Sequence, residues 1–193
     1  KQPGMVNTTV GYTGGKVENP TYQNHEGHAE AVEIEYETEK TSYKKLLNFF
    51  FQIHNPTTMN QQGNDRGTSY RSAIFYDNEE EKKEAENFID IVNKSGRWNN
   101  PVVTSLEPLT KFYPAEEYHQ KYYDYNPEKA YCQAIIVPKL IKFKEKYKRF
   151  FGKFKEAFRK KDDAVAEALK ATKFDSVKTL VIINMGLNET IWA

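Results

Sequence analysis

Glu30 is the residue whose type and position point most directly to chemistry. It stands at the start of AEAVEIEY (29–36), in which apolar and polar side chains alternate with period two. Val32, Ile34 and Tyr36 share its parity, so the alternation predicts that the Glu30 side chain points toward the core. Burial raises the pKa of a carboxyl group, which can then keep a proton near neutral pH and act as a general acid. The alternative is a solvated carboxylate at a frayed strand end.

Two glycine-rich segments carry further polar groups. In GNDRGTSYRS (63–72) the glycines allow a tight loop, Asp65 can accept hydrogen bonds from backbone N–H groups, and Tyr70 begins the next strand. In GYTGG…NPTY (11–22) a similar loop leads to Tyr22. Neither segment has the GxGxxG or GKS/T pattern of a phosphate loop, which argues against nucleotide binding. By its local chemistry alone, 63–72 also fits an ordinary Asx-type turn.

The cysteine and histidine content limits the chemistry further. The chain has one cysteine, Cys132, and four histidines. A single cysteine excludes an internal disulfide and a zinc site built from cysteines. The histidines form no HExxH-type pair, so we do not expect a metal site. We also expect no bound cofactor.

The elements that must position these residues alternate between strands and helices. We expect strands at 5–12, 29–36, 70–76, 102–108 and 177–184, and helices at 42–54, 79–95, 115–125, 139–160 and 163–171. Thr41 is expected to cap the first helix and Gly96 to end the second. This interleaving indicates an α/β or α+β two-layer domain.

The composition is that of a chain that can bury a core. Of 193 residues, 38% are hydrophobic and 14% aromatic, which is too aromatic for a disordered chain. No apolar run approaches the roughly 20 residues of a membrane span. Residues 139–161 carry a net charge of +9 and the remainder −8, which is not typical of a nucleic-acid-binding protein throughout. We therefore expect a cytoplasmic protein without a membrane or nucleic-acid partner.

Six strings together resemble the A-type peptide methionine sulfoxide reductases. In chain order they are GYTGG, NPTY, GHAEAV, HNPTTMNQQGNDRGTSYRSAIFY, FYPAEEYHQKYY and NPEKAYCQAIIVPK. The resemblance covers about residues 3–145. It implies an α+β two-layer sandwich of ferredoxin-like character with a mixed sheet, here followed by an additional C-terminal helical segment. It also implies a monomer that reduces methionine (S)-sulfoxide in peptides or proteins, with thioredoxin or another thiol such as dithiothreitol as the reductant.

The resemblance also assigns roles to individual residues. In the family reaction, a cysteine in a Gly-Cys-Phe-Trp motif attacks the sulfur and becomes a sulfenic acid, and a second thiol or thioredoxin restores it. The resemblance implies that Glu30 protonates the sulfoxide oxygen, and that Tyr22 and Tyr70 donate hydrogen bonds to it. It implies that Asp65 helps to orient the polar pocket. Such donors suit the reaction, because sulfur is attacked only if its oxygen becomes hydroxyl-like.

The sequence departs from the family at the nucleophile. The Gly-Cys-Phe-Trp motif is absent before PGMVNTTVGY (3–12), where the family has it. In some members the cysteine at the position of Cys132 is a resolving thiol, but the apolar AIIVPK that follows here favours a buried structural thiol. Impaired reduction is therefore expected, and the rival hypothesis is an inactive module that binds methionine sulfoxide or a peptide carrying it.

The C-terminal residues indicate where the missing part of the pattern could stand. Joining Ala193 to Lys1 gives KTLVIINMG-LNETIWA-KQPGM, which resembles the family's opening with the cysteine motif replaced. A circularly permuted chain would place Leu187 where the family has its nucleophile and would bring the chain ends close together. Its parts would be a reductase-like domain at 1–149, a helical connection at 150–176 and a strand completing the domain at 177–193. The alternative is an unrelated C-terminal extension.

Aromatic residues recur at helical spacing between the lysines and arginines of 139–160. Such a stripe can bind a membrane surface or nucleic acid. Packing on the domain, with the charged side chains solvated outside, is the interpretation that we adopt.

Overall fold

The computed structural model describes residues 4–138, 140, 141, 145 and 177–183. They belong to two compact units, one made of residues 4–125 with 177–183 and the other of the described residues from 126 to 145. The expected helical connection, the position of Leu187 and the proximity of the chain ends lie outside the described residues.

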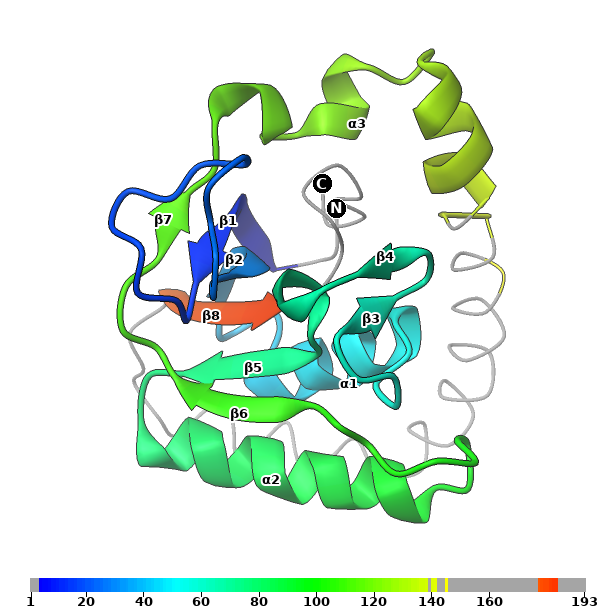
Figure 1. Cartoon of the computed structure of the whole chain (residues 1–193). Helices are drawn as coiled ribbons and strands as arrows, with labels where there is room; N and C mark the ends of the chain where they lie inside the picture. Colours follow the sequence, from blue (N-terminus) through cyan, green and yellow to red (C-terminus); the bar gives the residue numbers. More distant parts are fainter. Residues whose placement is uncertain (1–3, 139, 142–144, 146–176, 184–193) are drawn as a thin grey trace. The chain divides into compact units, whose positions relative to one another are not determined.

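A six-stranded mixed sheet organises the first unit (Figure 1). Its strands, in spatial order, are β6 (Ser105–Pro108), β5 (Ala73–Tyr76), β8 (Val177–Ile183), β2 (Ala29–Glu37), β1 (Met5–Thr13) and β7 (Tyr113–Pro114). β5 and β6 pair in parallel, and the other neighbouring pairs are antiparallel. The predicted mixed sheet and α/β class are confirmed.

β8 joins two parts of the sheet, although it comes last in the chain. Figure 1 shows it, in red, between β2 and β5. The Cα partner of Ile182 is Val32 on one side and Ile74 on the other. An apolar run such as VKTLVII is typical of a strand that is covered on both faces. A strand is therefore present where 177–184 predicted one, and it is internal to the sheet.

Two helices pack on each other beside the sheet. They are α1 (Tyr43–Ile53) and α2 (Glu79–Lys94), and α2 also contacts β5 and β6. The rings of Phe51 and Phe88 stack across the helix pair with their centroids 5.7 Å apart. Both side chains are buried, and the apolar spacing of 79–95 predicted this for Phe88.

The start of α1 differs from the expectation by one residue. Ser42, rather than Thr41, is the N-cap: its backbone is extended and its hydroxyl accepts a hydrogen bond from the Lys45 N–H group at 3.3 Å. Thr41 is buried instead. Gly96 follows α2 with φ 67°, a conformation that favours glycine, and marks the helix end as predicted.

Two predicted strands are shorter than expected. The strand predicted at 70–76 begins only at Ala73, because Thr68–Tyr70 forms a 3-10 turn, η1. The strand predicted at 102–108 begins at Ser105. A short hairpin of β3 (Gln61–Gln62) and β4 (Asp65–Arg66), which the sequence did not predict, precedes η1.

The single helix predicted at 115–125 is wrong. The segment contains a 3-10 turn, η2 (Glu117–His119), and one turn of helix, α3 (Tyr122–Tyr125). Lys121 lies between them with φ 48°, a left-handed conformation that a continuous helix excludes. In the second unit, the described helical residues begin at Ala130, and Cys132–Ile136 forms a π-helical turn, η3. This helix begins well before the expected residue 139.

A buried chain of hydrogen bonds joins α1 to the start of β5. The Nδ1–H group of His54 donates to the Phe50 carbonyl at 2.7 Å. Its Nε2 therefore accepts from the Ser72 hydroxyl at 2.8 Å, and Ser72 in turn accepts from the Thr104 hydroxyl at 2.7 Å. Burial lowers the pKa of His54 to about 4, so the ring is neutral in the folded protein at neutral pH.

We expect His54 to remove about 3 kcal/mol of stability as the pH falls from about 7 to about 4. In this window the unfolded chain protonates the histidine, whose ordinary pKa is 6.5, whereas the folded protein does not until the pH reaches about 4. The unfolded state binds more protons, so lower pH favours unfolding. Urea unfolding at a series of pH values measures the effect. A His54→Gln variant should lack this component, and an identical pH dependence in both proteins would contradict the assignment.

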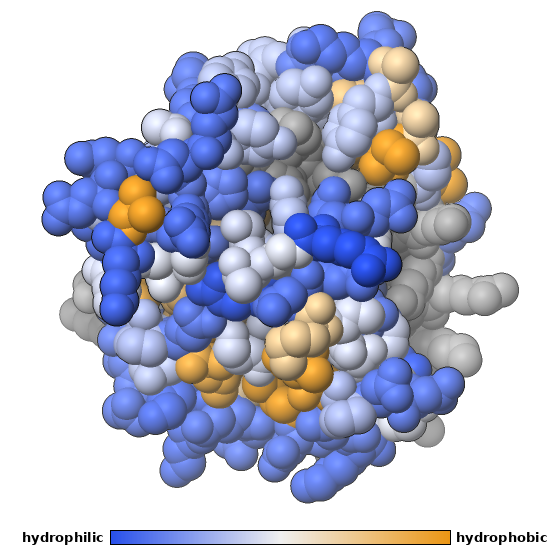
Figure 2. All heavy atoms as spheres, in the orientation of Figure 1, coloured by the Kyte–Doolittle hydropathy of each residue, from blue (hydrophilic) through white to orange (hydrophobic). Residues whose placement is uncertain are grey.

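Within the described ranges, no helix is long and apolar enough to cross a membrane. On the face drawn in Figure 2, hydrophilic residues predominate and hydrophobic ones gather in small separate groups. Among the described residues on this face, the hydrophobic groups do not join into one contiguous patch.

Candidate active site

Glu30 is buried at the start of β2, with 2% of its surface exposed. Val32, Ile34 and Tyr36 on the same face are buried as well, so the predicted inward parity is confirmed. The alternative of a solvated carboxylate at a frayed end is thereby excluded. Across the sheet, the Cα partner of Glu30 is Tyr12 of β1.

Tyr70 lies beside Glu30. Its hydroxyl donates a hydrogen bond to the Glu30 carboxyl group. Burial, followed by the negative charges of Glu30 and Asp65, raises the pKa of Tyr70, to which Tyr22 also contributes. The phenol therefore keeps its proton and remains a hydrogen-bond donor at neutral pH.

The loop before β5 positions Asp65 and Tyr70. Gly67 connects β4 to η1 with φ 135°, a conformation that residues with a side chain rarely adopt. Its N–H group donates to the Asn60 carbonyl at 3.0 Å, and its carbonyl accepts from the Tyr70 N–H group at 3.0 Å. These bonds fold the glycine-rich segment back on itself, so that η1 contacts β2 near Glu30.

Glu116 ties the loop that carries Tyr22 to the sheet. Its Oε2 accepts from the Tyr12 hydroxyl at 3.0 Å, and its Oε1 accepts from the Tyr22 backbone N–H group at 2.9 Å. Burial alone would raise the pKa of Glu116, but the hydrogen bonds from Tyr22 and Tyr12 lower it below its usual value. Glu116 is therefore an anion that holds both tyrosines. The Tyr22 side chain itself is 42% exposed.

A row of aromatic rings runs from solvent to the buried carboxyl group. Tyr118 is 62% exposed, and its ring centroid lies 4.3 Å from that of His119, which lies 4.9 Å from Tyr22. The Tyr22 ring is 6.2 Å from His25, which stacks on the fully buried Tyr12 at 5.0 Å. These rings form an aromatic wall with hydrogen-bonding edges beside Glu30.

The structure brings the predicted residues of the first unit together. Glu30, Tyr70 and Asp65 interact directly or through charge, and Tyr22 is close enough to Tyr70 to raise its pKa. Cys132 belongs to the second unit and is fully buried, as the apolar residues after it predicted. Leu187 lies outside the described residues.

Four residues near Glu30 were not predicted from the sequence as part of the site. They are Tyr12, His25, Glu116 and His119. The pairing of Tyr12 with Glu30 requires knowledge of the β1–β2 register, which the pattern of a single strand does not contain. A signal for Glu116 and His119 was present, because both belong to the string FYPAEEYHQKYY.

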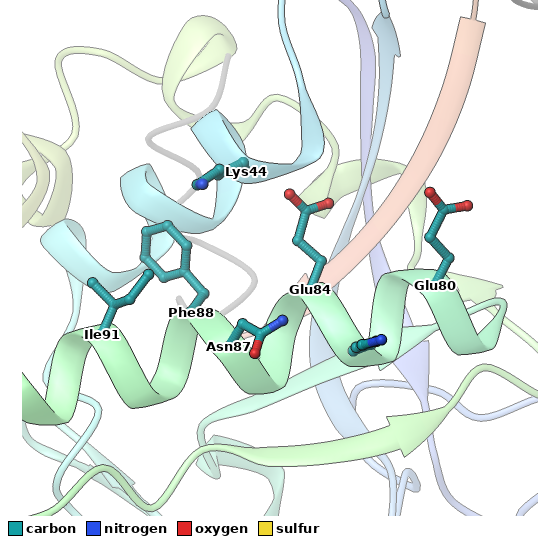
Figure 3. Close-up of a pocket in the computed structure, with 7 residues that line it drawn as sticks. Lys44, Glu80, Glu84, Asn87, Phe88 and Ile91 are labelled. Carbon is teal, nitrogen blue, oxygen red and sulfur yellow. The ribbon is translucent and has the colours of Figure 1, made fainter.

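A hollow of about 340 Å³ lies between α1 and α2 (Figure 3). Its lining residues are Lys44, Glu80, Lys83, Glu84, Asn87, Phe88 and Ile91. Figure 3 shows that Phe88, Ile91, Glu80 and Glu84 project from α2 on the side where Lys44 lies. The hollow has an apolar base and a rim of mixed charge, and it shares no residue with the cluster around Glu30.

The cluster around Glu30 has the groups needed to bind and protonate a polar oxygen atom. A buried carboxyl group donates a hydrogen bond in its protonated form, and the Tyr70 phenol, whose O–H group here donates to Glu30, keeps its proton at neutral pH. Among the described residues, no group of three or more potential ligands could hold a metal ion. The burial of Glu30 beside the Tyr70 hydroxyl is an arrangement that suits acid chemistry.

Comparison with known proteins agrees with the resemblance in the sequence. The family model described as peptide methionine sulfoxide reductase matches residues 1–150. The peptide methionine sulfoxide reductase MsrA of Nocardia farcinica is 58% identical over 122 residues, covering 63% of this chain and 72% of the relative. The MsrA 2 of Rhodopirellula baltica is 56% identical over 132 residues, covering 68% and 79%.

Solved structures agree as well. The reduced form of Mxr1 from Saccharomyces cerevisiae superposes with a TM-score of 0.61 and 34% identity, covering 67% of this chain and 76% of that one. The methionine sulfoxide reductase A of Corynebacterium diphtheriae gives 0.57 and 31%, covering 66% of each chain. The fold class predicted from the sequence is confirmed by these neighbours. With a family match over more than half of its length and relatives above 50% identity, the chain belongs to the peptide methionine sulfoxide reductases, the family that reduces methionine sulfoxide.

Proposed function

We propose that Glu30 keeps a proton in the folded protein and donates it to the oxygen of methionine (S)-sulfoxide. The observation that carries this proposal is the burial of Glu30, 2% exposed, beside the Tyr70 hydroxyl. A carboxyl group that is buried so deeply favours its neutral form. Without a ligand, the neutral form accepts the Tyr70 hydrogen bond through its carbonyl oxygen. In this proposal, Tyr70, which has one O–H group, transfers that bond to the sulfoxide oxygen when the substrate binds, and Glu30 donates its own proton to the same oxygen.

Tyr22, Tyr70 and Asp65 complete the proposed oxygen site. Tyr70, with its raised pKa, remains a donor throughout the neutral range. Tyr22 is partly exposed, and Glu116 fixes its backbone, so it is placed to close over a bound substrate. Asp65, whose charge acts on Tyr70, would orient that phenol. Donors that converge on the sulfoxide oxygen draw electrons from sulfur and prepare it for attack by a thiol.

The 193-residue chain, in this proposal, binds methionine sulfoxide but reduces it poorly. Its one thiol, Cys132, is 0% exposed and belongs to the second unit. The oxygen and nitrogen groups around Glu30 are weak nucleophiles toward sulfur compared with a thiolate. The same observation favours the second candidate function, an inactive module that binds methionine sulfoxide or a peptide carrying it.

The pairing of β8 supports the proposal of a circularly permuted chain. Ile183 is the Cα partner of Ala73, which follows Tyr70 by three positions, and Ile182 is the partner of Val32, two positions after Glu30. The C-terminal end of β8 therefore lies beside the first residues of β2 and β5, at the end of the strands where the proposed oxygen site lies. A residue soon after this end, which we take to be Leu187, would stand where the family has its nucleophile. Residues 1–149 and 177–193 would then form one domain connected by 150–176.

The family resemblance supports several finer proposals. We propose that thioredoxin, or another thiol such as dithiothreitol, is the reductant of any form of the protein that has a nucleophilic cysteine in its site. We also propose a monomer that works in the cytoplasm on oxidised methionine, free or within proteins. Co-purification and gel filtration of the full chain test the partner and the oligomeric state.

The proposal predicts that the chain distinguishes the sulfoxide from the thioether. N-acetyl-methionine (S)-sulfoxide methylamide should bind about tenfold or more tightly than the corresponding methionine derivative, which has no oxygen to accept the donors. Calorimetric titration of the full chain with both compounds measures the difference. Equal affinities would overturn the proposal, and the (R)-sulfoxide provides a matched ligand that should bind more weakly than the (S) form.

A further inference from the structure

Arg71, the residue after Tyr70, is anchored to Glu107 of β6. Its Nε–H group donates to Oε1 of Glu107 at 2.9 Å, and an Nη2–H group donates to Oε2 at 3.0 Å. Such a two-bond pair matches the planar guanidinium to the planar carboxylate and fixes its direction as well as its distance. The two side chains are 16% and 26% exposed, so salt screens the pair less than it screens pairs on the open surface.

Glu107 is an anion in the folded protein. Burial alone would raise the pKa of Glu107, but the hydrogen bonds from Arg71 and Ser105 lower it below its usual value. The Ser105 hydroxyl donates to Oε1 of Glu107 at 2.7 Å, from the same strand two residues earlier. Glu107 is therefore a fixed acceptor on the main sheet, and it holds the guanidinium in place.

The anchored guanidinium closes the turn that carries Tyr70. The Thr68 carbonyl accepts two hydrogen bonds from Arg71, one from the backbone N–H group at 3.2 Å and one from an Nη1–H group at 3.0 Å. Ser69 and Tyr70 lie between these two residues, in η1. Because the Nη1–H group belongs to a side chain that is fixed to β6, this bond attaches η1 to the sheet.

The loop after β1 packs closely against the same guanidinium. A Cβ atom on Gly14 would lie 2.8 Å from Nη2 of Arg71 and 2.7 Å from the ring of Phe75. Gly14 also has φ 82°, so this position needs glycine both for its conformation and for the close approach. The guanidinium carbon of Arg71 lies 6.0 Å from the centroid of the Phe75 ring. These neighbours further restrict the movement of Arg71.

The place of the Tyr70 hydroxyl depends on the direction in which η1 leaves the sheet. The hydroxyl donates to Glu30 of β2, whereas Tyr70 itself precedes β5. β8 lies between β2 and β5, so no strand pairing fixes the distance between the two side chains. Arg71 and Ser72 are the only residues between η1 and β5. A contact that orients η1 therefore also decides whether Tyr70 reaches Glu30.

We infer that Arg71 is a positioning residue that places the Tyr70 hydroxyl in the proposed oxygen site through the Thr68 carbonyl. This inference rests on the proposed function, in which Tyr70 donates to the sulfoxide oxygen. A lysine at position 71 would keep the charge, but its compact ammonium group lacks the planar fork that binds both carboxylate oxygens while reaching a third acceptor. The side-chain bond to Thr68 would be lost, and the hydroxyl would be placed less well.

A double-mutant cycle of Arg71→Lys and Tyr70→Phe tests the inference. Calorimetric titration of the full chain measures the dissociation constants of N-acetyl-methionine (S)-sulfoxide methylamide and of N-acetyl-methionine methylamide. Tyr70→Phe should weaken sulfoxide binding about tenfold, the cost of one lost hydrogen bond, and Arg71→Lys should weaken it about fivefold. Neither variant should change the binding of the thioether, which has no oxygen to accept the bond.

The double variant separates positioning from general support of the fold. If Arg71 acts through the Tyr70 hydroxyl, it has nothing left to position in Tyr70→Phe, and the double variant should bind the sulfoxide no more weakly than Tyr70→Phe alone. Losses that multiply to about fiftyfold would overturn the inference, because independent effects add in free energy. Equal losses for the sulfoxide and the thioether in Arg71→Lys would overturn it as well.

Tyr70→Phe also separates failure of the inference from failure of the proposed function. Unchanged sulfoxide affinity in Tyr70→Phe would show that this phenol does not bind the oxygen, and the proposed oxygen site would fail together with the inference. Weaker binding in Tyr70→Phe with unchanged binding in Arg71→Lys would leave the oxygen site intact and overturn only the role of Arg71.

Arg97→Lys is the matched control. Arg97 also donates from a guanidinium Nη2–H group to a backbone carbonyl, that of Gln52 at 3.2 Å, but it follows α2 and is not part of the cluster around Glu30. Its variant should bind both compounds as the wild type does.

Glu107→Gln covers the case in which Arg71→Lys does not fold. It removes the charge of the anchor and leaves Arg71 in place. It should lower sulfoxide affinity in the wild-type background and have no effect in the Tyr70→Phe background. A loss of equal size in both backgrounds, or no loss in either, would overturn the inference.

Discussion

Incubated with a peptide methionine (S)-sulfoxide and an excess of dithiothreitol, the 193-residue chain is expected to produce methionine no faster than the thiol alone. Sulfoxide reduction needs a soft nucleophile at sulfur, and the single thiol of the chain, Cys132, is fully buried. Removing the nucleophile from an enzyme of this kind of covalent mechanism costs about 10⁴-fold or more in rate. The hydrogen-bond donors around Glu30 would bind the sulfoxide oxygen, but no nucleophile would attack the sulfur atom.

Chromatography of the methionine product measures this rate. The matched variant is Cys132→Ser, which removes the thiol and changes little else in volume. Wild type and variant should give the same background rate. Thiol-dependent turnover that Cys132→Ser abolishes would contradict the expectation and would make Cys132 the nucleophile.

Local sequence patterns were sufficient to predict the strand that carries Glu30 and a second strand of the same sheet. The alternation in 29–36 predicts both β2 and the inward direction of Glu30, because strand side chains alternate between two faces and one face is buried. The apolar run at 177–183 likewise predicts a strand. The helix predicted at 115–125 failed because the positive φ of Lys121 has no counterpart in the residue types around it.

The groups that surround Glu30 depend on contacts between distant parts of the chain. Glu116 joins Tyr12 and Tyr22 although it follows them by 104 and 94 positions. His25 faces Glu30 only because its loop is held by the Thr21 carbonyl and by stacking on Tyr12. Neither set of contacts produces a periodic pattern in the sequence from which it could be predicted. Family strings therefore identified Tyr22, Tyr70 and Asp65, while the register of the sheet was needed for the others.

Replacing Glu30 by leucine should weaken the binding of methionine (S)-sulfoxide by about 10- to 100-fold. Leucine is similar in size and suits a buried position, but it donates no hydrogen bond and leaves the Tyr70 hydroxyl without the acceptor it uses in the wild type. Glu30→Gln should behave differently. Its amide can still donate to the sulfoxide oxygen, so affinity should be retained but should no longer depend on a titrating proton.

Glu33 provides a control on the same strand. It lies on the opposite face of β2 and is only partly buried, and burial followed by the charge of Glu35 raises its pKa. Glu33→Leu thus makes the same chemical change on the opposite face of the same strand, without touching the oxygen site. Its sulfoxide affinity should equal that of the wild type.

The dissociation constant of N-acetyl-methionine (S)-sulfoxide methylamide, measured by calorimetry at about pH 6 and about pH 9, tests the acid role of Glu30 most directly. The account predicts tight binding at the lower pH and weak binding at the higher pH for the wild type and Glu33→Leu. It predicts equal binding at both for Glu30→Gln and weak binding at both for Glu30→Leu. Wild-type affinity in Glu30→Leu at the lower pH would contradict the claim that the Glu30 proton binds the sulfoxide oxygen.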